Sequence, residues 1–222
     1  LWEDVNAIDE EETHFLGSIV VIERSEGLNE LNRLEVVDGQ QRLATVSILL
    51  SVIREKYRGN EEYSKHANTI ENDYLWDYDL DEERYQNLTL SKFDNDSYRA
   101  ILDRDYSNIE SEQLEEASKF FANKVDSLSL DEVDTLRKRL LSSVTLVTIE
   151  CDEEQSAFRL FETLNDRGLE LSAVDLMKNH LFSIAANPND VDYIKIQSDW
   201  EEIIENTVPY LSKPSRFFRH YI

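Results

Sequence analysis

The chain has 222 residues, enough for one large domain or two small ones around a packed core. Its composition, 41% apolar and 10% aromatic, excludes a disordered chain and favours a globular one. With 23 basic and 47 acidic side chains, the formal net charge of -24 repels a nucleic-acid backbone, so any bound anion must be held by a local site.

Residues that could hold a metal or act as nucleophiles are few. Cys151 is the single cysteine, which excludes an internal disulfide and a Cys-cluster zinc site, and its acidic neighbours in "TIECDEE" predict a raised thiol pKa. The four histidines show no ligand spacing. No apolar run is long enough to span a membrane and no signal peptide is present, so we expect a cytoplasmic protein. From the start at Leu1 and the lone Met177 we expect either an excised fragment or a partly ordered chain, with essential residues outside the sequence.

The first half of the chain predicts strands and one helix. Apolar, β-branched residues at 15–24 and 34–37 flank a polar segment, which predicts a hairpin or strand pair. From Leu43 to Tyr57 the apolar residues recur at spacings of three and four, which predicts an amphipathic helix. The acidic segment 61–83 shows no clean period, so we expect a loosely helical or irregular insertion whose charges are solvated.

The remaining segments predict two further strands among many helices. Residues 85–91 are expected to return a strand to the sheet, and the alternating segment 143–150 is expected to form a late strand. A capping residue, Asp131 or Ser129, should begin the helix over 131–142. The other predicted helices cover 94 or 96 to 102, 110–127, 153–165, 172–186, 190–207 and 213 to the end.

These elements predict an α+β fold with a small mixed sheet followed by a mostly helical extension. We expect residues 1–152 to form a mixed α/β core that includes the acidic insertion. Residues 153–222 are expected to form a helical subdomain.

The turn in "EVVDGQQRLATV" carries more polar groups than a change of direction requires. The first turn of a helix and its dipole favour an anion, and Gly39 lets a ligand approach the backbone. Arg42 suits phosphate or carboxylate, and Asp38 could either bind Mg²⁺ or cap the helix. Gln40 and Gln41 cannot act as acid or base, but a glutamine amide can orient an attacking water beside a phosphate. Alternatively, the turn is structural and Arg42 pairs with a carboxylate of the fold.

A second polar cluster lies in "FRLFETLNDRGLELSAVDLMKN". Gly168 suits the end of one helix, and a capping box beginning at Ser172 suits the start of the next. Those structural roles do not explain Asn165, Arg167 or Lys178. Together these three side chains could form a polar wall facing the first turn.

Established nucleotide and nuclease motifs are absent. None of the five glycines is followed by Lys, which excludes a Walker A loop, and no Rossmann GxGxxG or kinase set occurs. No HNH or PD-(D/E)xK nuclease pattern occurs either.

Both motifs, about 120 residues apart and in this order, resemble the N-terminal domain of GmrSD-type modification-dependent restriction enzymes. That family carries an Asp-Gly-Gln-Gln-Arg signature. "FLGSIVV" before the signature, "LTLSKFDNDSYRAIL" after it and "LVTIECDEEQSAFRLFETLN" before the second motif extend the resemblance over nearly the whole chain.

The resemblance implies a ParB/sulfiredoxin-like core and nucleoside triphosphate hydrolysis that controls a nuclease in defence against phage or modified DNA. It assigns catalysis to Asp38, Gln40, Gln41 and Arg42, with Asp38 also holding Mg²⁺. It assigns nucleotide binding to Gly39, Thr45, Asn165, Arg167, Gly168 and Lys178. The implied partners are an HNH-type nuclease domain or subunit and modified or foreign DNA, without a membrane, and a homodimer is compatible with it.

The chain departs from the family pattern at Ala44, where a Thr is common. The family's opening segment with its Tyr-Gln-Arg stretch, and the HNH-type domain that often follows, lie outside this sequence. If that Gln-Arg pair completes the site, the chain alone is expected to be inactive. The alternative function is a non-catalytic module that senses a nucleotide or modified base and docks a partner.

Overall fold

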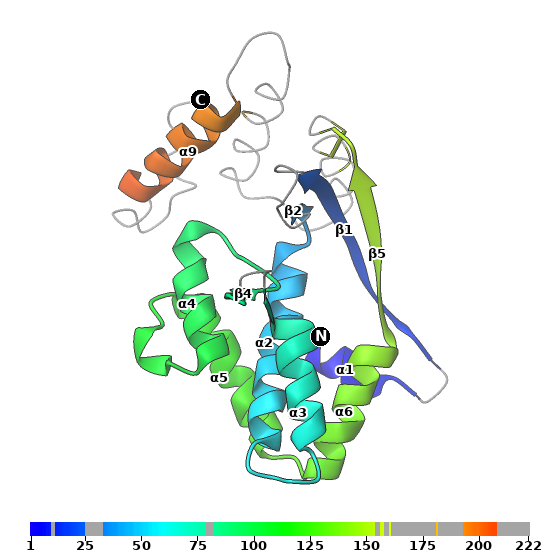
Figure 1. Ribbon diagram of the computed structural model, residues 1–222. Coiled ribbons are helices and arrows are strands. Elements are labelled where there is room, and N and C mark those ends of the chain that lie inside the picture. The colour runs from blue at the N-terminus through cyan, green and yellow to red at the C-terminus, as the bar shows by residue number, and fades with distance from the viewer. Residues whose placement is uncertain are drawn as a thin grey trace. The chain divides into compact units, whose positions relative to one another are not determined.

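The computed structural model describes residues 1–9, 12–24, 33–78, 82–153, 156–157, 160, 181 and 193–207. Its residues form two compact units (Figure 1). The first comprises Leu1–Ser18 and Gly39–Val147, and the second comprises Ile19–Asp38 and Thr148–Ile222. Strands and helices occur together, so the α+β class is confirmed. The predicted division at residue 152 stays a prediction.

A three-stranded sheet confirms the predicted strands. Its order is β2 (Arg33–Asp38), β1 (His14–Arg24) and β5 (Val144–Cys151). β1 and β2 are antiparallel, with Val20 opposite Asp38 and an irregularity between Val20 and Val21. The β1 and β5 arrows run in the same direction in Figure 1, so the sheet is mixed as expected. The ParB/sulfiredoxin-like type stays a prediction.

The second unit has its own small apolar core on this sheet. Successive side chains of a strand point to opposite faces of the sheet, so every second residue of β1 can contribute to this core. Val20, Ile22, Cys151 and Ala157 are buried, and Val37, Ile149 and Leu160 pack against them.

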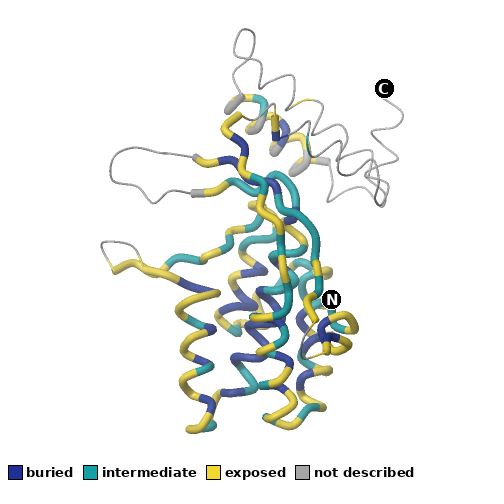
Figure 2. The backbone as a smooth tube through the Cα atoms, turned by 90° about the vertical axis from the view of Figure 1, so that its right-hand side faces the viewer, coloured by how far each residue is buried: buried dark blue, intermediate teal, exposed yellow. Residues whose placement is uncertain are grey.

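Helix α2 (Gln40–Tyr57) is the centre of the first unit. It packs against α3 (Ser64–Thr69), α4 (Lys92–Asp103), α5 (Glu112–Asp126) and α6 (Leu130–Ser142). The predicted helix is therefore confirmed, but its amphipathic character is wrong. Neighbours on several sides bury Ile48, Leu49 and Val52 as well as Leu50, Ile53 and Tyr57 of the predicted face, as expected for a helix at the centre of a core. Figure 2 shows how buried residues run through the helices of this unit.

The acidic segment after α2 is more ordered than predicted. It contains α3, a π-helical turn η1 (Ile70–Leu75) and β3 (Trp76–Tyr78). Its charge is not wholly solvated, because the Glu71 carboxylate accepts hydrogen bonds from Arg54 and Arg84. Residues 85–91 do not return to the main sheet as expected. Instead β4 (Arg84–Gln86) pairs with β3 in a separate two-stranded sheet, since β3 supplies an adjacent partner strand.

Most other helices match their sequence patterns. α4, α5 and α6 are confirmed to within a few residues, and Ser129 rather than Asp131 caps α6. The helix predicted over 190–207 is α9 (Tyr193–Thr207), and the short elements are α1 (Trp2–Ala7) and η2 (Tyr106–Asn108). The helices predicted over 153–165, 172–186 and 213 onward lie largely or wholly outside the described residues. Within the described ranges, no helix is long and apolar enough to cross a membrane.

Candidate functional site

The predicted turn lies where β2 ends and α2 begins. Asp38 is the last residue of β2, and Gly39 turns the chain with φ 95° and ψ 6° before α2 begins at Gln40. A side chain disfavours this left-handed conformation, so glycine is the suitable residue here. The N-cap is Gly39, so the alternative in which Asp38 caps the helix is wrong.

The first turn of α2 carries no acidic residue. Gly39 has no side chain to accept a hydrogen bond from the first N–H groups of the helix, so the usual side-chain cap is missing. Gln40 and Gln41 are exposed, while Gly39 is buried. The helix therefore carries no acidic residue in its own first turn, a condition that favours an external anion at the positive end of its dipole.

Arg42 is held against strand β1. Its Nη1 donates a hydrogen bond of 2.8 Å to the carbonyl of Ser18. A Cβ built on Gly17 would lie 3.1 Å from Arg42 Nε and 3.4 Å from Cζ, so the guanidinium packs directly over this glycine. Gly17 also has φ 124°, which a side chain would strain.

Sequence reasoning missed Gly17 as a residue of the site. A glycine inside a β-branched strand marks a bulge or a close approach of another group, and "FLGSIVV" contains that signal. The identity of the approaching group is not local, because Ser18 and Arg42 are 24 positions apart. Only the folded chain shows that β1 orients Arg42.

The structure also gives the positions of Thr45 and Asp38, whose proposed roles stay predictions. The hydroxyl of Thr45 donates a 2.6 Å hydrogen bond to the Gln41 carbonyl, one turn back in α2. Asp38 is half-buried, and within the described part of the chain no three His, Cys, Asp or Glu side chains form a metal-binding group. Mg²⁺ commonly uses one or two carboxylates together with substrate phosphates, so a single Asp38 fits that ion.

The second predicted motif, comprising Asn165, Arg167, Gly168 and Lys178, lies outside the described residues. Its nucleotide-binding role stays a prediction.

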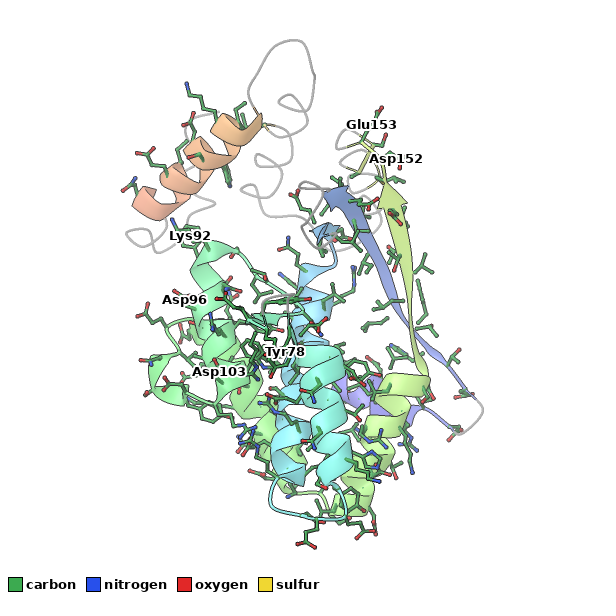
Figure 3. The ribbon with its side chains drawn as sticks, in the orientation of Figure 1. Tyr78, Lys92, Asp96, Asp103, Asp152 and Glu153 are labelled. Carbon is green, nitrogen blue, oxygen red and sulfur yellow. The ribbon has the colours of Figure 1, made fainter. Side chains whose placement is uncertain are left out.

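Cys151 lies at the end of β5, next to Asp152 and Glu153 (Figure 3). The thiol is free and buried. Burial, and to a lesser extent the charge of Asp152, raises the thiol pKa above its ordinary value, which confirms the predicted direction. A thiol with a raised pKa is a poor nucleophile, so Cys151 is a core residue.

Comparison with models of protein families identifies a family. The family model described as "GmrSD restriction endonuclease, N-terminal domain" matches residues 1–182, which include both sequence motifs. No curated protein matches the chain.

Proposed function

The chain belongs to the family of GmrSD restriction endonuclease N-terminal domains, and from this we propose that it binds and hydrolyses a nucleoside triphosphate to regulate DNA restriction. In this proposal, turnover at the turn between β2 and α2 controls an associated HNH-type nuclease. The biological role is defence against phage or foreign, modified DNA.

The orientation of Arg42 is the observation that carries this proposal. Its guanidinium rests on Gly17 and is tied to the Ser18 carbonyl, at the start of a helix that has no acidic first turn. A pre-oriented guanidinium loses less conformational freedom when it binds, and its planar fork matches phosphate oxygens. A phosphate group beside this turn would meet both the helix dipole and a fixed positive charge.

The neighbouring residues supply complementary groups. Gln40 and Gln41 are exposed amides in the first turn, suited to orient a water molecule beside a terminal phosphate. Asp38 would hold Mg²⁺, which neutralises charge on the phosphate oxygens when bound. The family resemblance also assigns nucleotide binding to Asn165, Arg167, Gly168 and Lys178, which lie outside the described residues.

The proposed partners follow from the family. An HNH-type nuclease domain or subunit would cut DNA, because no nuclease pattern occurs in this sequence. The chain carries a net charge of -24, which repels DNA. Contact with modified or foreign DNA would therefore require a local cluster of basic groups. We place the complete system in the cytoplasm, where invading DNA arrives.

Phosphate release from the four ribonucleoside triphosphates with Mg²⁺ tests the proposal. The assay compares the intact protein with its Arg42→Ala and Arg99→Gln variants, with and without duplex DNA. Arg42→Ala should lower kcat by about 100-fold or more, as removal of a phosphate-binding arginine does elsewhere. Arg99 is exposed and lies on α4, so Arg99→Gln is the charge-matched control and should retain activity. Unchanged turnover in Arg42→Ala would disprove the proposed role of the turn.

The two neutral glutamine side chains in the first turn favour an alternative function, in which the site binds a ligand without catalysis. Gln40 and Gln41 cannot exchange a proton, so the same site could bind a nucleotide or modified base without hydrolysing it. Tight nucleotide binding that depends on Arg42, with no phosphate release under any condition, would identify the chain as this sensing and assembly module.

A further inference from the structure

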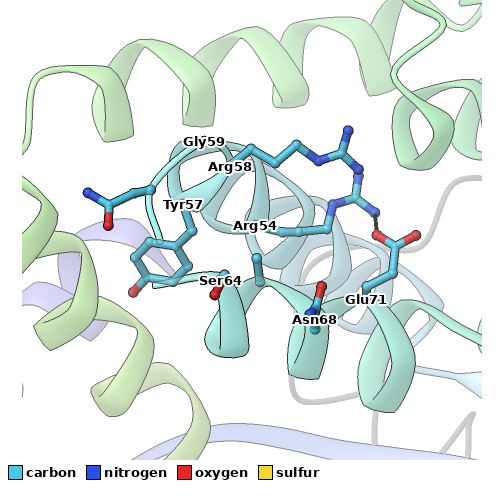
Figure 4. Close-up of a pocket in the computed structure, with 9 residues that line it drawn as sticks. Arg54, Tyr57, Arg58, Gly59, Ser64, Asn68 and Glu71 are labelled. Carbon is cyan, nitrogen blue, oxygen red and sulfur yellow. Dashed lines mark hydrogen bonds and ion pairs between the residues drawn. The ribbon is translucent and has the colours of Figure 1, made fainter. Parts of the chain in front are cut away.

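A second polar site lies at the opposite end of α2. A pocket of about 280 Å³ is bounded by the last turn of α2, the following turn and α3 (Figure 4). Its volume suits a small ligand. The polar residues that line it are Arg54, Arg58, Asn60, Ser64, Asn68 and Glu71.

Arg54 lines this pocket and is buried, with only 1% of its surface exposed. Its Nη1 donates to Glu71 Oε2 at 2.5 Å, and its Nη2 donates to the Leu102 carbonyl at 2.6 Å. Its buried Nε has no hydrogen-bond partner. A buried N–H donor without an acceptor is uncommon, and here the donor belongs to a charged side chain that lines a cavity.

Arg58 adds a second positive charge. It is exposed, and within the described ranges its side chain makes no hydrogen bond or ion pair. Burial lowers the pKa of Arg54, and the nearby charge of Arg58 lowers it further, against the opposing effect of Glu71. Arg54 and Arg58 line the same pocket, so an anion bound there would be attracted by both guanidinium groups.

The carboxylate in the pocket does not cancel this charge. Glu71 is paired with Arg54 on one oxygen and with Arg84 on the other. Counting the pocket lining alone, two guanidinium groups face one carboxylate, which leaves a local excess of positive charge on a chain of net charge -24.

Compensation of the helix dipole is the ordinary reason for arginines in a last turn. That role accounts for a positive charge at the end of α2. It does not account for the unpartnered Nε of Arg54, or for the amide of Asn68 in the same cavity. Guanidinium, amide and hydroxyl groups together are the donors that proteins use for phosphate.

We propose that this pocket binds the phosphate group of a small phosphorylated molecule. Arg54 and Arg58 would supply charge, and the Asn68 amide would supply a neutral hydrogen bond. The site is separate from the turn at Gly39, because it lies at the other end of the 18-residue helix α2. A ligand here would act as an effector rather than as the proposed substrate.

Isothermal titration calorimetry of the intact protein tests this proposal, with inorganic phosphate and a nucleoside 5′-monophosphate as separate probes. Arg58→Gln should raise the Kd for the tighter probe by about tenfold or more. Asn68→Ala should raise it by about threefold. Arg58 is exposed and unpaired among the described residues, so its removal should leave the fold intact.

Arg99→Gln serves as the charge-matched control and should bind as the unchanged protein does. Arg42→Ala separates the two ends of α2 and should retain this binding. Tighter binding of the monophosphate identifies a phosphomonoester ligand, and tighter binding of phosphate identifies the free ion. Binding that survives Arg58→Gln, binding lost only in Arg42→Ala, or no binding of either probe would overturn the proposal.

Discussion

Helices α2 and α6 begin in opposite ways. At α6 the hydroxyl of Ser129 accepts from the Glu132 N–H at 3.4 Å, and the Glu132 carboxylate accepts from the Ser129 N–H at 2.8 Å. At α2 the N-cap is a left-handed glycine, and no acidic residue follows in the first turn. The start of α6 is satisfied by its own side chains, whereas the start of α2 has a glycine N-cap without a side chain and carries an oriented arginine at a predicted binding turn.

This difference indicates that α2 begins as it does for reasons other than stability. A Ser or Asp N-cap stabilises a helix by only a few tenths of a kcal/mol relative to a Gly N-cap, so the choice of cap adds little to the stability of α2. The stability of α2 comes instead from burial along its length, where Ile48, Leu49 and Ile53 are almost fully buried. Because packing stabilises α2, its first turn does not need a side-chain cap and is available for ligand binding.

Moving Arg42 should have the largest effect among the following tests. Gly17→Ala strains a backbone at φ 124° and places a Cβ 3.1 Å from Arg42 Nε, so the guanidinium must shift. We expect a loss of about 1–3 kcal/mol in the free energy of unfolding and of about tenfold or more in kcat for the proposed hydrolysis. Urea unfolding and a phosphate-release assay measure the two effects.

Gly59→Ala is the matched control for this variant. Gly59 also has a positive φ, 80°, but a Cβ there would meet nothing within 4 Å. Because this backbone lies closer to the left-handed helical region than that of Gly17, Gly59→Ala should show a smaller strain cost, about 1 kcal/mol, with normal turnover. Equal losses of turnover in both variants would show that strain alone, and not the displaced Arg42, causes the effect.

Gly39→Ser tests whether the start of α2 can be converted to an ordinary cap. Serine caps helices from an extended backbone, as Ser129 does at φ -69° and ψ 162°, whereas Gly39 has φ 95°. The substitution should destabilise the protein by about 1–2 kcal/mol rather than stabilise it. The reverse exchange, Ser129→Gly, should cost only a few tenths of a kcal/mol, by about the usual difference between these caps. A more stable Gly39→Ser protein would contradict the assigned backbone conformation.

Ser129→Ala should reduce stability without affecting function. It removes both the acceptor of the Glu132 N–H and the hydroxyl that donates to Glu132 Oε2 at 2.7 Å. We expect a loss of about 1 kcal/mol in the free energy of unfolding, measured by urea denaturation. Turnover and nucleotide affinity should not change, because Ser129 belongs to the structural helix start. A decrease in either would place α6 in the proposed site.

The smallest effect should be a pH dependence at this same cap. Hydrogen bonds from the Ser129 side chain and then its backbone lower the pKa of Glu132 below its ordinary value. Because the folded pKa is the lower one, the stabilisation is complete above the unfolded pKa and is lost as the pH falls through the folded pKa. The stability difference between the unchanged protein and Glu132→Gln should therefore begin to shrink as the pH falls below about 4.3 and should disappear only below the lowered folded pKa of Glu132. Glu116→Gln on the exposed face of α5 is the control, and a difference that persists at low pH would argue against the charged cap.

Local patterns were sufficient to predict much of the fold. Alternating β-branched residues predicted β1, β2 and β5, and the helical spacing from Leu43 predicted α2. The Ser129 cap was also predictable, since its partner Glu132 is three residues away. The segment at 85–91 was assigned to the wrong sheet because its composition does not specify a partner strand, and β3 was hidden in an acidic segment without a clear period.

The sequence by itself therefore determined the α+β class, the Asp-Gly-Gln-Gln-Arg turn and the order of strand, turn and helix around it. These features depend on residues within a few positions of one another. Only the tertiary structure decided that Gly39, not Asp38, is the cap, that Arg42 rests on Gly17, and that Arg54 and Arg58 share a pocket with Glu71. Such contacts depend on strand register and helix packing, which no local pattern specifies.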